Sequence, residues 1–181
     1  MKLVFCLAGK TDRGPVAELV DNYRKRISRY VPVEIIEARK LKLQQREGIH
    51  VLLSPDGRSL TSEGLASFLG EAMNSSARHL FFYVGGPEGF DEELEKQVSN
   101  RISLSPMTFN HQLARVMLFE QVYRAYEVPV YNLARRICRT VEDAEDVLQE
   151  TFFEVCRSIH QYRGDGSLWG WVRTIAASKA L

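Results

Sequence analysis

The chain has 181 residues, of which 45% are hydrophobic and 26% are charged, and its formal net charge is +1 at pH 7. This composition is typical of a globular protein and excludes a chain too polar to fold. No apolar run approaches the roughly 20 residues that a membrane-spanning helix needs. Three widely spaced cysteines, Cys6, Cys138 and Cys156, lack the spacing of a metal site, which favours a reduced, cytoplasmic setting.

Basic residues are concentrated near the amino terminus. Residues 1–50 hold eleven Lys and Arg against six Asp and Glu, whereas residues 127–181 hold seven against eight. A basic surface of this kind suits phosphates, such as those of a nucleic acid. A helix face that contacts only solvent is the alternative interpretation, and the charge pattern leaves both open.

The chain begins with strand and helix patterns in alternation. "KLVFCLAG" (2–9) is typical of a buried strand rather than of a signal peptide. "GPVAELVDNYRKRISRYV" (14–31) has helical spacing, with Pro15 in the first turn, where its missing N–H costs nothing. Further strands are expected at 31–38 and 50–54, and the connection between them is close to the minimum for a parallel crossover, which leaves little room for a helix.

The middle of the chain continues this alternation. "PDGRS" (55–59) predicts a turn, and a helix is expected over 60–74, capped by Thr61 or Ser62. Four elements come next in order: the strand "HLFFYV" (79–84), a helix at 91–98, mixed strand and loop at 101–109, and a helix at 111–128. Strands that alternate with helices indicate an α/β protein with a parallel sheet covered on both faces.

The pattern changes near Pro129, which disfavours helix at Val128 and is expected to end the preceding helix there. The remainder of the chain has helical patterns: one helix begins at Thr140 with a capping-box-like start, and another begins after Ser167. We therefore expect two units, an α/β domain over 1–128 and a small all-α segment over 129–181.

Three loops are expected at the carboxyl ends of strands, where open parallel sheets bind ligands. The first is "GGPEG" (85–89), which matches neither phosphate-binding glycine motif and carries acids instead of a lysine, so it suits a neutral or cationic ligand. A plain strand-to-helix turn is the alternative. The others are "LLSPDG" (52–57) and "SLSPMTFNHQLAR" (103–115), which places His111 and Arg115 on one side of a helix.

The combination of "YVGGPEGF" with "SLSPMTFNHQLARVMLFEQVYRAY" resembles the large-subunit ribosomal RNA methyltransferase H family, within the SPOUT superfamily, over residues 1–126. The resemblance implies an α/β sheet with a deep carboxyl-terminal trefoil knot, S-adenosylmethionine bound in the knot and a homodimer. It also implies a reaction, transfer of a methyl group to N3 of a pseudouridine in 23S rRNA on the ribosome.

Site residues are also implied by this resemblance. His111 and Arg115 would be catalytic and would flank the RNA, and Arg24, Lys25 and Arg26 would meet rRNA phosphates. The cofactor would contact Leu53, Gly85, Gly86, Ser105, Pro106, Met107, Thr108, Phe109 and Asn110. No metal is implied.

This chain departs from the family in its tail. The family ends soon after "YRA" with a short segment containing Pro-Tyr-His, which closes the site, and that tripeptide does not occur here. We therefore expect an impaired methyltransferase.

The end of the chain resembles a second family, region 2 of sigma-70 factors of the extracytoplasmic-function group, over residues 130–181 and truncated. "DAEDVLQETF" is similar to the helix that docks on core RNA polymerase, which implies contacts by Asp146 and Gln149. "YRGDGSLWGWVRTIA" is similar to the part that binds the melted promoter, which implies Tyr162, Arg163, Trp169 and Trp171. A polymerase-binding module, a helix pair whose tryptophans form a small core, and a chimeric chain without activity remain the alternatives.

Overall fold

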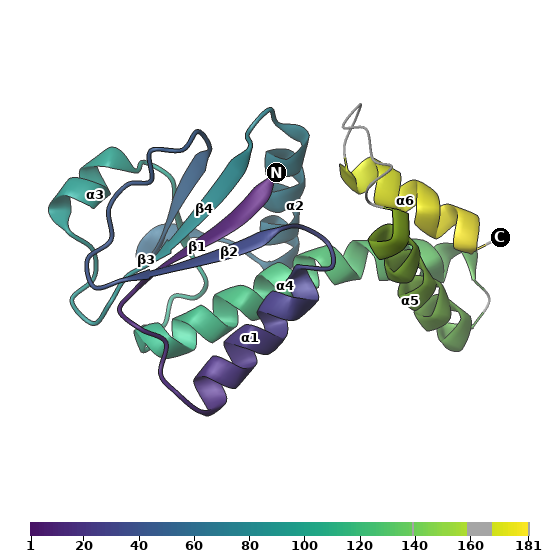
Figure 1. Ribbon diagram of the computed structural model, residues 1–181, viewed down its shortest axis with the longest axis horizontal. Coiled ribbons are helices and arrows are strands. Elements are labelled where there is room, and N and C mark those ends of the chain that lie inside the picture. The colour runs from purple at the N-terminus through teal and green to yellow at the C-terminus, as the bar shows by residue number, and fades with distance from the viewer. Residues whose placement is uncertain (139, 159–167, 181) are drawn as a thin grey trace.

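The computed structural model describes the backbone of residues 1–138, 140–158 and 168–180, and their side chains except at 128–136, 141, 152, 156, 168 and 169. Five strands form one sheet (Figure 1): β1 Lys2–Ala8, β2 Val33–Ala38, β3 Ile49–Ser59, β4 His79–Val84 and β5 Arg101–Ser103. The helices are α1 Pro15–Ile27, α2 Ser62–Asn74, α3 Glu92–Gln97, α4 His111–Ile137, α5 Val141–Ser158 and α6 Leu168–Lys179.

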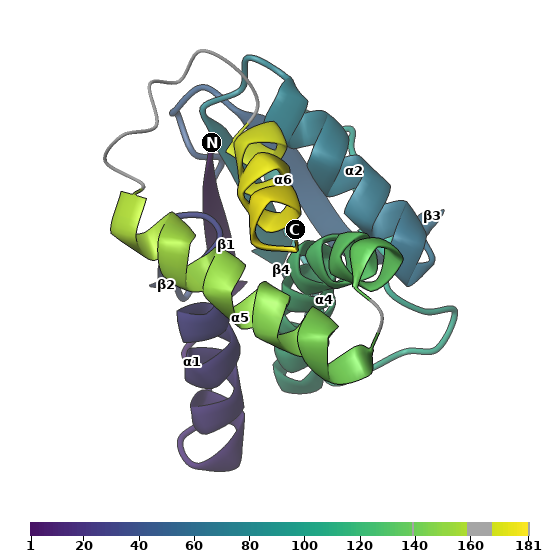
Figure 2. The ribbon, with the colours of Figure 1, turned by 90° about the vertical axis from the view of Figure 1, so that its right-hand side faces the viewer.

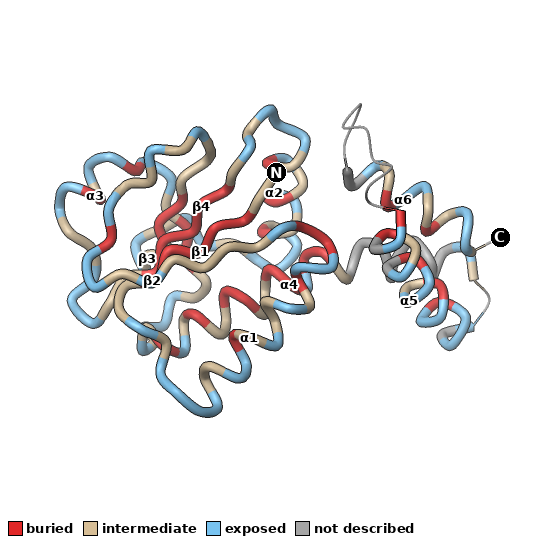
Figure 3. The backbone as a smooth tube through the Cα atoms, viewed as in Figure 1, coloured by how far each residue is buried: buried red, intermediate tan, exposed pale blue. Residues whose placement is uncertain are grey.

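The sheet has the strand order β2-β1-β4-β3-β5, and every pair is parallel. Alternate residues of β1 and β4 point to opposite faces, and both faces are buried. Helices α1, α2 and α4 cover one face, while α3 and the segment 39–48 cover the other (Figures 1 and 3). The predicted α/β class with a covered parallel sheet is confirmed, and the trefoil knot stays a prediction.

Helix boundaries follow the local chemistry that the sequence carries. Pro15 stands at the start of α1, and Thr61 caps α2, its Oγ1 accepting a hydrogen bond from the Gly64 N–H at 3.1 Å. Thr140 caps α5 in the same way, accepting from the Asp143 N–H at 3.1 Å. The segment 39–48 has no helix, as its short length suggested.

The turn predicted at "PDGRS" is wrong, because β3 continues through it to Ser59. Arg58 and Ser59 pair with Ile102 and Ser103 of β5, and the register shifts between Leu53 and Arg58. Because Leu53 and Arg58 both pair with Ile102, the residues between them form an irregularity inside β3 that has no partner in β5.

The helix end predicted at Val128 is also wrong, because α4 runs through Pro129 to Ile137. Proline inside a helix removes one hydrogen bond and costs about 3 kcal/mol. Both α5 and α6 pack against α4 (Figure 2), and this packing offsets the loss.

The helical end of the chain shares its core with the sheet. Val155 of α5 and Val172 and Ala176 of α6 belong to the same buried cluster as Phe5 of β1 and Phe119 of α4. The segment of about 50 residues, marginal as an independent core, therefore packs on the α/β unit. None of the described helices is both long and apolar enough to cross a membrane.

Candidate functional site

The carboxyl ends of the five parallel strands lie at one edge of the sheet (Figure 1). Val84, the last residue of β4, pairs with Leu7 of β1 on one side and with Leu53 of β3 on the other. The loop that begins at Gly85 therefore lies between the chain leaving β1 and the chain leaving Leu53. The structure brings Leu53, Gly85 and Gly86 together, as the sequence predicted.

The glycine loop is a tight four-residue turn with Pro87 and Glu88 exposed at its tip. The Gly89 N–H donates to the Gly86 carbonyl at 3.0 Å, and the Gly86 N–H donates to the Gly89 carbonyl at 3.3 Å. Gly89 has a φ of 79°, and a Cβ on Gly85 would lie 3.0 Å from the Gly89 oxygen. The turn itself thus needs these glycines, and it presents their backbone at the sheet edge.

The loop 105–110 joins β5 to α4 at the same edge. Ser103 Oγ donates to the Ser105 carbonyl at 2.8 Å, and the Met107 N–H donates to Ser105 Oγ at 3.0 Å. Asn110 Oδ1 accepts from the Gln112 N–H at 2.8 Å and so caps α4. Pro106, Met107 and Thr108 are exposed, and no hydrogen bond between described residues joins this loop to the glycine loop. Phe109 is half-buried.

Arg115 is completely buried and holds the chain leaving β1 against α4. Its Nη2 donates to the carbonyls of Ala8 and Gly9, and its Nη1 donates to Thr11 Oγ1 at 3.2 Å. Burial lowers the pKa of the guanidinium, and the carboxylates of Glu37 and Asp12 oppose that shift. The Nε has no hydrogen-bond partner among the described residues. In this structure Arg115 is turned inward, toward backbone.

His111 is the first residue of α4 and is half-buried. Its Nε2 lies 3.3 Å from the side-chain nitrogen of Gln112. It therefore lies beside the polar contacts that join α4 to the β1–α1 loop.

Sequence reasoning missed Gln112, which holds the β1–α1 loop from α4. Its Oε1 accepts from the Asp12 N–H at 3.1 Å, and its Nε2 donates to the Lys10 carbonyl at 3.0 Å. Thr11 is held in turn by Glu37, whose Oε1 accepts from the Thr11 N–H at 2.8 Å and from Oγ1 at 2.6 Å. The sequence did contain a signal for this role. Gln112 and Arg115 are polar, yet their spacing places them on the same face of α4 as the apolar residues Phe119 and Val122, which face the core.

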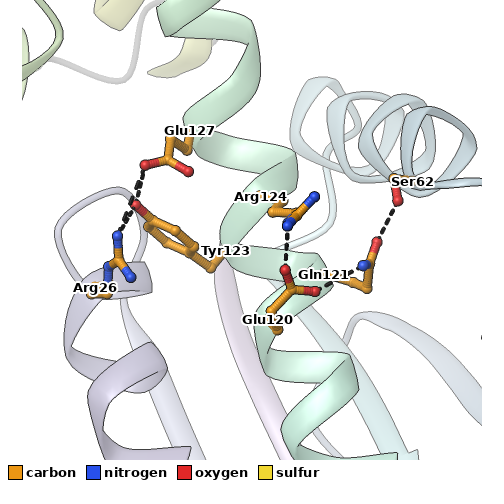
Figure 4. Close-up of polar contacts among 7 residues, drawn as sticks. All are labelled: Arg26, Ser62, Glu120, Gln121, Tyr123, Arg124 and Glu127. Carbon is orange, nitrogen blue, oxygen red and sulfur yellow. Dashed lines mark hydrogen bonds and ion pairs between the residues drawn. The ribbon is translucent and has the colours of Figure 1, made fainter. Parts of the chain in front are cut away.

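The predicted RNA-binding side chains of α1 all have partners within the chain. Asp21 pairs with Arg24 and with Lys25, each at 2.7 Å, and the hydrogen bonds from Lys25 and Arg24 lower the pKa of Asp21. Arg26 lies over the ring of Tyr123, with its Cζ 3.9 Å from the ring centre, and approaches Glu127 (Figure 4). Burial raises the pKa of Tyr123 to about 12.

A cavity of about 1180 Å³ opens between α1, α4 and α5. Arg26 lines it from α1, Arg29 from the turn after α1, Tyr123 from α4, and Gln149 and Phe153 from α5. Its lining thus includes Arg26, which was predicted to bind RNA, and Gln149, which was predicted to bind polymerase.

The remaining predicted polymerase and promoter residues are only partly described. Asp146 is exposed on α5, and Trp171 of α6 is half-buried against the shared core. Tyr162 and Arg163 lie outside the described residues, as does the side chain of Trp169. The described residues include no group of three or more His, Cys, Asp or Glu placed to hold a metal ion.

Comparison with known proteins gives two matches along the chain. Residues 1–130 match the family model "Predicted SPOUT methyltransferase", and residues 122–181 match "Sigma-70 region 2". The two matches overlap inside α4, the helix that runs through the predicted boundary. Both resemblances found in the sequence are confirmed.

Two relatives illustrate the first match, and one solved structure is reported beside them. A Coprothermobacter proteolyticus protein named "Ribosomal RNA large subunit methyltransferase H" is 40% identical over 131 residues, covering 71% of this chain and 94% of the relative. A protein of the same name from Citrifermentans bemidjiense is 37% identical over 145 residues, with the same two coverages. The structure of a probable methylase family protein from Haemophilus influenzae has a TM-score of 0.46 at 7% identity, over 98% of this chain and 96% of its own.

The family model covers well over half of the chain, and the relatives align over nearly their whole length. On this ground the chain belongs to the SPOUT methyltransferase family.

Proposed function

We propose that the chain is an S-adenosylmethionine-dependent methyltransferase acting on large-subunit rRNA, at N3 of a pseudouridine. The observation that carries this proposal is the match at 40% identity to a relative named for large-subunit rRNA methylation, over 94% of that relative. The pairing of Leu53 in β3 with Val84, the residue before Gly85, supports it. Because rRNA is the substrate, the enzyme works in the cytoplasm.

The residues at this edge suit such a cofactor. No residue of the segment 85–89 is basic, and the exposed carboxylate of Glu88 favours a sulfonium over a polyphosphate. Gly85 and Gly86 offer backbone without side chains beside Leu53, and the loop 105–110 follows β5 at the same end of the sheet. Bound there, S-adenosylmethionine would supply an electrophilic methyl group.

The chain's own residues then have to orient the RNA and remove a proton. Positioning of the acceptor nitrogen supplies much of the rate in such a transfer. As N3 forms its bond to the methyl carbon it loses its proton, so an acceptor is needed close by. His111, half-buried at the start of α4, is the candidate acceptor, and Arg115 keeps the neighbouring loop in place.

Calorimetry with S-adenosylmethionine tests the cofactor site, and saturable heat is expected. Absence of saturation at millimolar concentration would reject the site. Methyl transfer is a separate test, with labelled cofactor and ribosomes that lack the modification. Low activity is expected because the Pro-Tyr-His tail is absent, and rates near those of the family would contradict this. The homodimer and the trefoil knot belong to the same proposal. Light scattering would test the homodimer by measuring the molecular mass in solution.

A second candidate function is binding of core RNA polymerase by the segment 129–181, which packs on the α/β unit. The match of residues 122–181 to Sigma-70 region 2 favours it. Pull-down with core polymerase tests it, with Asp146→Ala and Gln149→Ala expected to lose binding. Glu142→Ala, an exposed acid near the start of the same helix, is the matched control. No capture of polymerase by the unaltered chain would remove this candidate, and a chimeric chain without activity would fail both tests.

A further inference from the structure

The β1–α1 loop, residues 9–14, is held in a fixed shape at the edge of the candidate site. It begins and ends at glycines with positive φ, Gly9 at 74° and Gly14 at 82°. The Gly9 N–H donates to the Ala38 carbonyl at 2.8 Å. Together with the contacts made by Gln112, Glu37 and Arg115, this bond holds residues 9 to 12 in succession.

The loop lies beside the residues proposed to act in methyl transfer. A Cβ placed on Gly86 would lie 3.6 Å from the Cβ of Ala8, the residue before the loop. On the other side, Gln112 binds the loop and adjoins His111. A substrate that reaches between Gly86 and His111 therefore passes the loop.

Two cations project from this loop. Lys10 and Arg13 are exposed, and neither has an ion-pair partner among the described residues. Arg39, which follows β2 at the same edge, is a third exposed cation of this kind. The loop's one acid, Asp12, is engaged by Gln112. The cations of α1 are different in this respect, because each of them has an ion-pair partner within the chain: Arg24, Lys25 and Arg26.

We propose that the loop 9–14 binds backbone phosphates of the RNA substrate through Lys10 and Arg13. The inference rests on the proposed function, since it needs an RNA that enters the candidate site. Because hydrogen bonds hold residues 9–12, this part of the loop loses little conformational freedom on binding, and Lys10 loses less entropy than a cation of a mobile loop would. Phosphate contacts of this kind position the RNA and carry no sequence information.

The test compares two double variants of the full chain that remove the same charge. Lys10→Gln with Arg13→Gln removes the loop cations, and Arg24→Gln with Lys25→Gln removes paired cations of α1. Binding to a large-subunit rRNA transcript is measured against salt concentration. Two lost phosphate contacts reduce the slope of log K against log salt by about 1.4 for single-stranded RNA. We expect that reduction in the loop variant and an unchanged slope in the α1 variant.

Calorimetry with S-adenosylmethionine on the same variants separates this inference from the function on which it rests. We expect unchanged cofactor binding in both. Two results would overturn the inference alone, provided that the unaltered chain binds RNA and transfers methyl groups. The first is a loop variant that keeps the full slope of log K against log salt. The second is an α1 variant whose slope falls by as much as that of the loop variant. If the unaltered chain binds no RNA, the rRNA substrate and the loop contact are both rejected.

Discussion

Phe119 of α4 stacks on Phe5 of β1, with ring centroids 4.0 Å apart and the ring planes 25° apart. Both side chains are completely buried, and Phe5 also stacks on Phe82 of β4. This contact ties the long helix to the two central strands. It belongs to the cluster that also includes residues of α5 and α6.

Phe119→Ala should lower the free energy of unfolding by about 3–5 kcal/mol, because it removes a buried ring and leaves a cavity. Urea denaturation followed by circular dichroism measures the change. The control is Phe153→Ala on α5, where the ring is 71% exposed and the expected change is within about 0.5 kcal/mol. Equal effects at both positions would contradict the assignment of the core.

Gly57→Ala should destabilise the fold, because its Cβ would lie 2.5 Å from the backbone carbon of Ile102. Overpacking of this kind costs about 1–3 kcal/mol. Gly70→Ala in α2 is the matched control, since nothing lies within 4 Å of its added Cβ and alanine is the better helix former by about 1 kcal/mol. The two changes should thus move the melting temperature in opposite directions, and a stabilised Gly57→Ala variant would refute the close approach of β3 to β5.

Arg115→Met should loosen the β1–α1 loop, because it removes the donor to the carbonyls of Ala8 and Gly9. Each carbonyl left buried without a partner costs about 1–3 kcal/mol. Limited digestion with trypsin reads this out directly, since Lys10 and Arg13 are cleavage sites within the loop. Faster cleavage after these two residues is expected, while Arg24→Met should leave their cleavage unchanged. Identical digestion of all three proteins would argue that Arg115 does not hold the loop.

Stability should fall as the pH falls below about 6.5, partly through His50. Burial lowers its pKa below the ordinary 6.5, so the unfolded chain takes up a proton more readily than the folded one. The stabilisation is therefore present above pH 6.5 and is lost as the pH falls toward the folded pKa. Its Nδ1 lies 2.9 Å from Tyr83 Oη, which accepts from the Gln44 N–H. Urea midpoints of His50→Gln should depend less on pH, and an equal dependence in both proteins would exclude the histidine as the cause.

The chain should unfold in one transition, because α5 and α6 share the core of the α/β unit. Both tryptophans, Trp169 and Trp171, belong to α6, so tryptophan fluorescence reports on that end alone. Circular dichroism reports on the whole chain. The midpoints of the two signals should coincide. An earlier fluorescence transition would mean that the helical segment melts independently.

The sequence predicted those features that depend on neighbours along the chain. The strand and helix of each βα unit, the Thr61 and Thr140 caps and the missing crossover helix at 39–48 all arise from local chemistry. The closeness of Leu53 to Gly85 and Gly86 was also predictable, because the strands that carry them were expected to lie in one parallel sheet.

The features that the sequence did not predict depend on distant partners. The strand through Pro55 exists because β5, more than 40 residues later, pairs with Arg58 and Ser59. Asp12 and Gln112 are separated by 100 positions, and Thr11 and Glu37 by 26. Such contacts decide which polar residues are turned inward, and no local pattern specifies them. The same holds for Arg26, whose partners are on α4.

Because α4 is continuous across Pro129, the number of residues at this point sets the direction in which α5 and α6 lie around the helix axis. Each residue of an α-helix advances the chain by about 1.5 Å and turns it by about 100°. A single residue inserted after Pro129 would therefore swing α5 and α6 around the helix axis and withdraw Val155, Val172 and Ala176 from the cluster around Phe119. An insertion of seven residues would restore the direction to within about 20°, though about 10 Å farther along the axis.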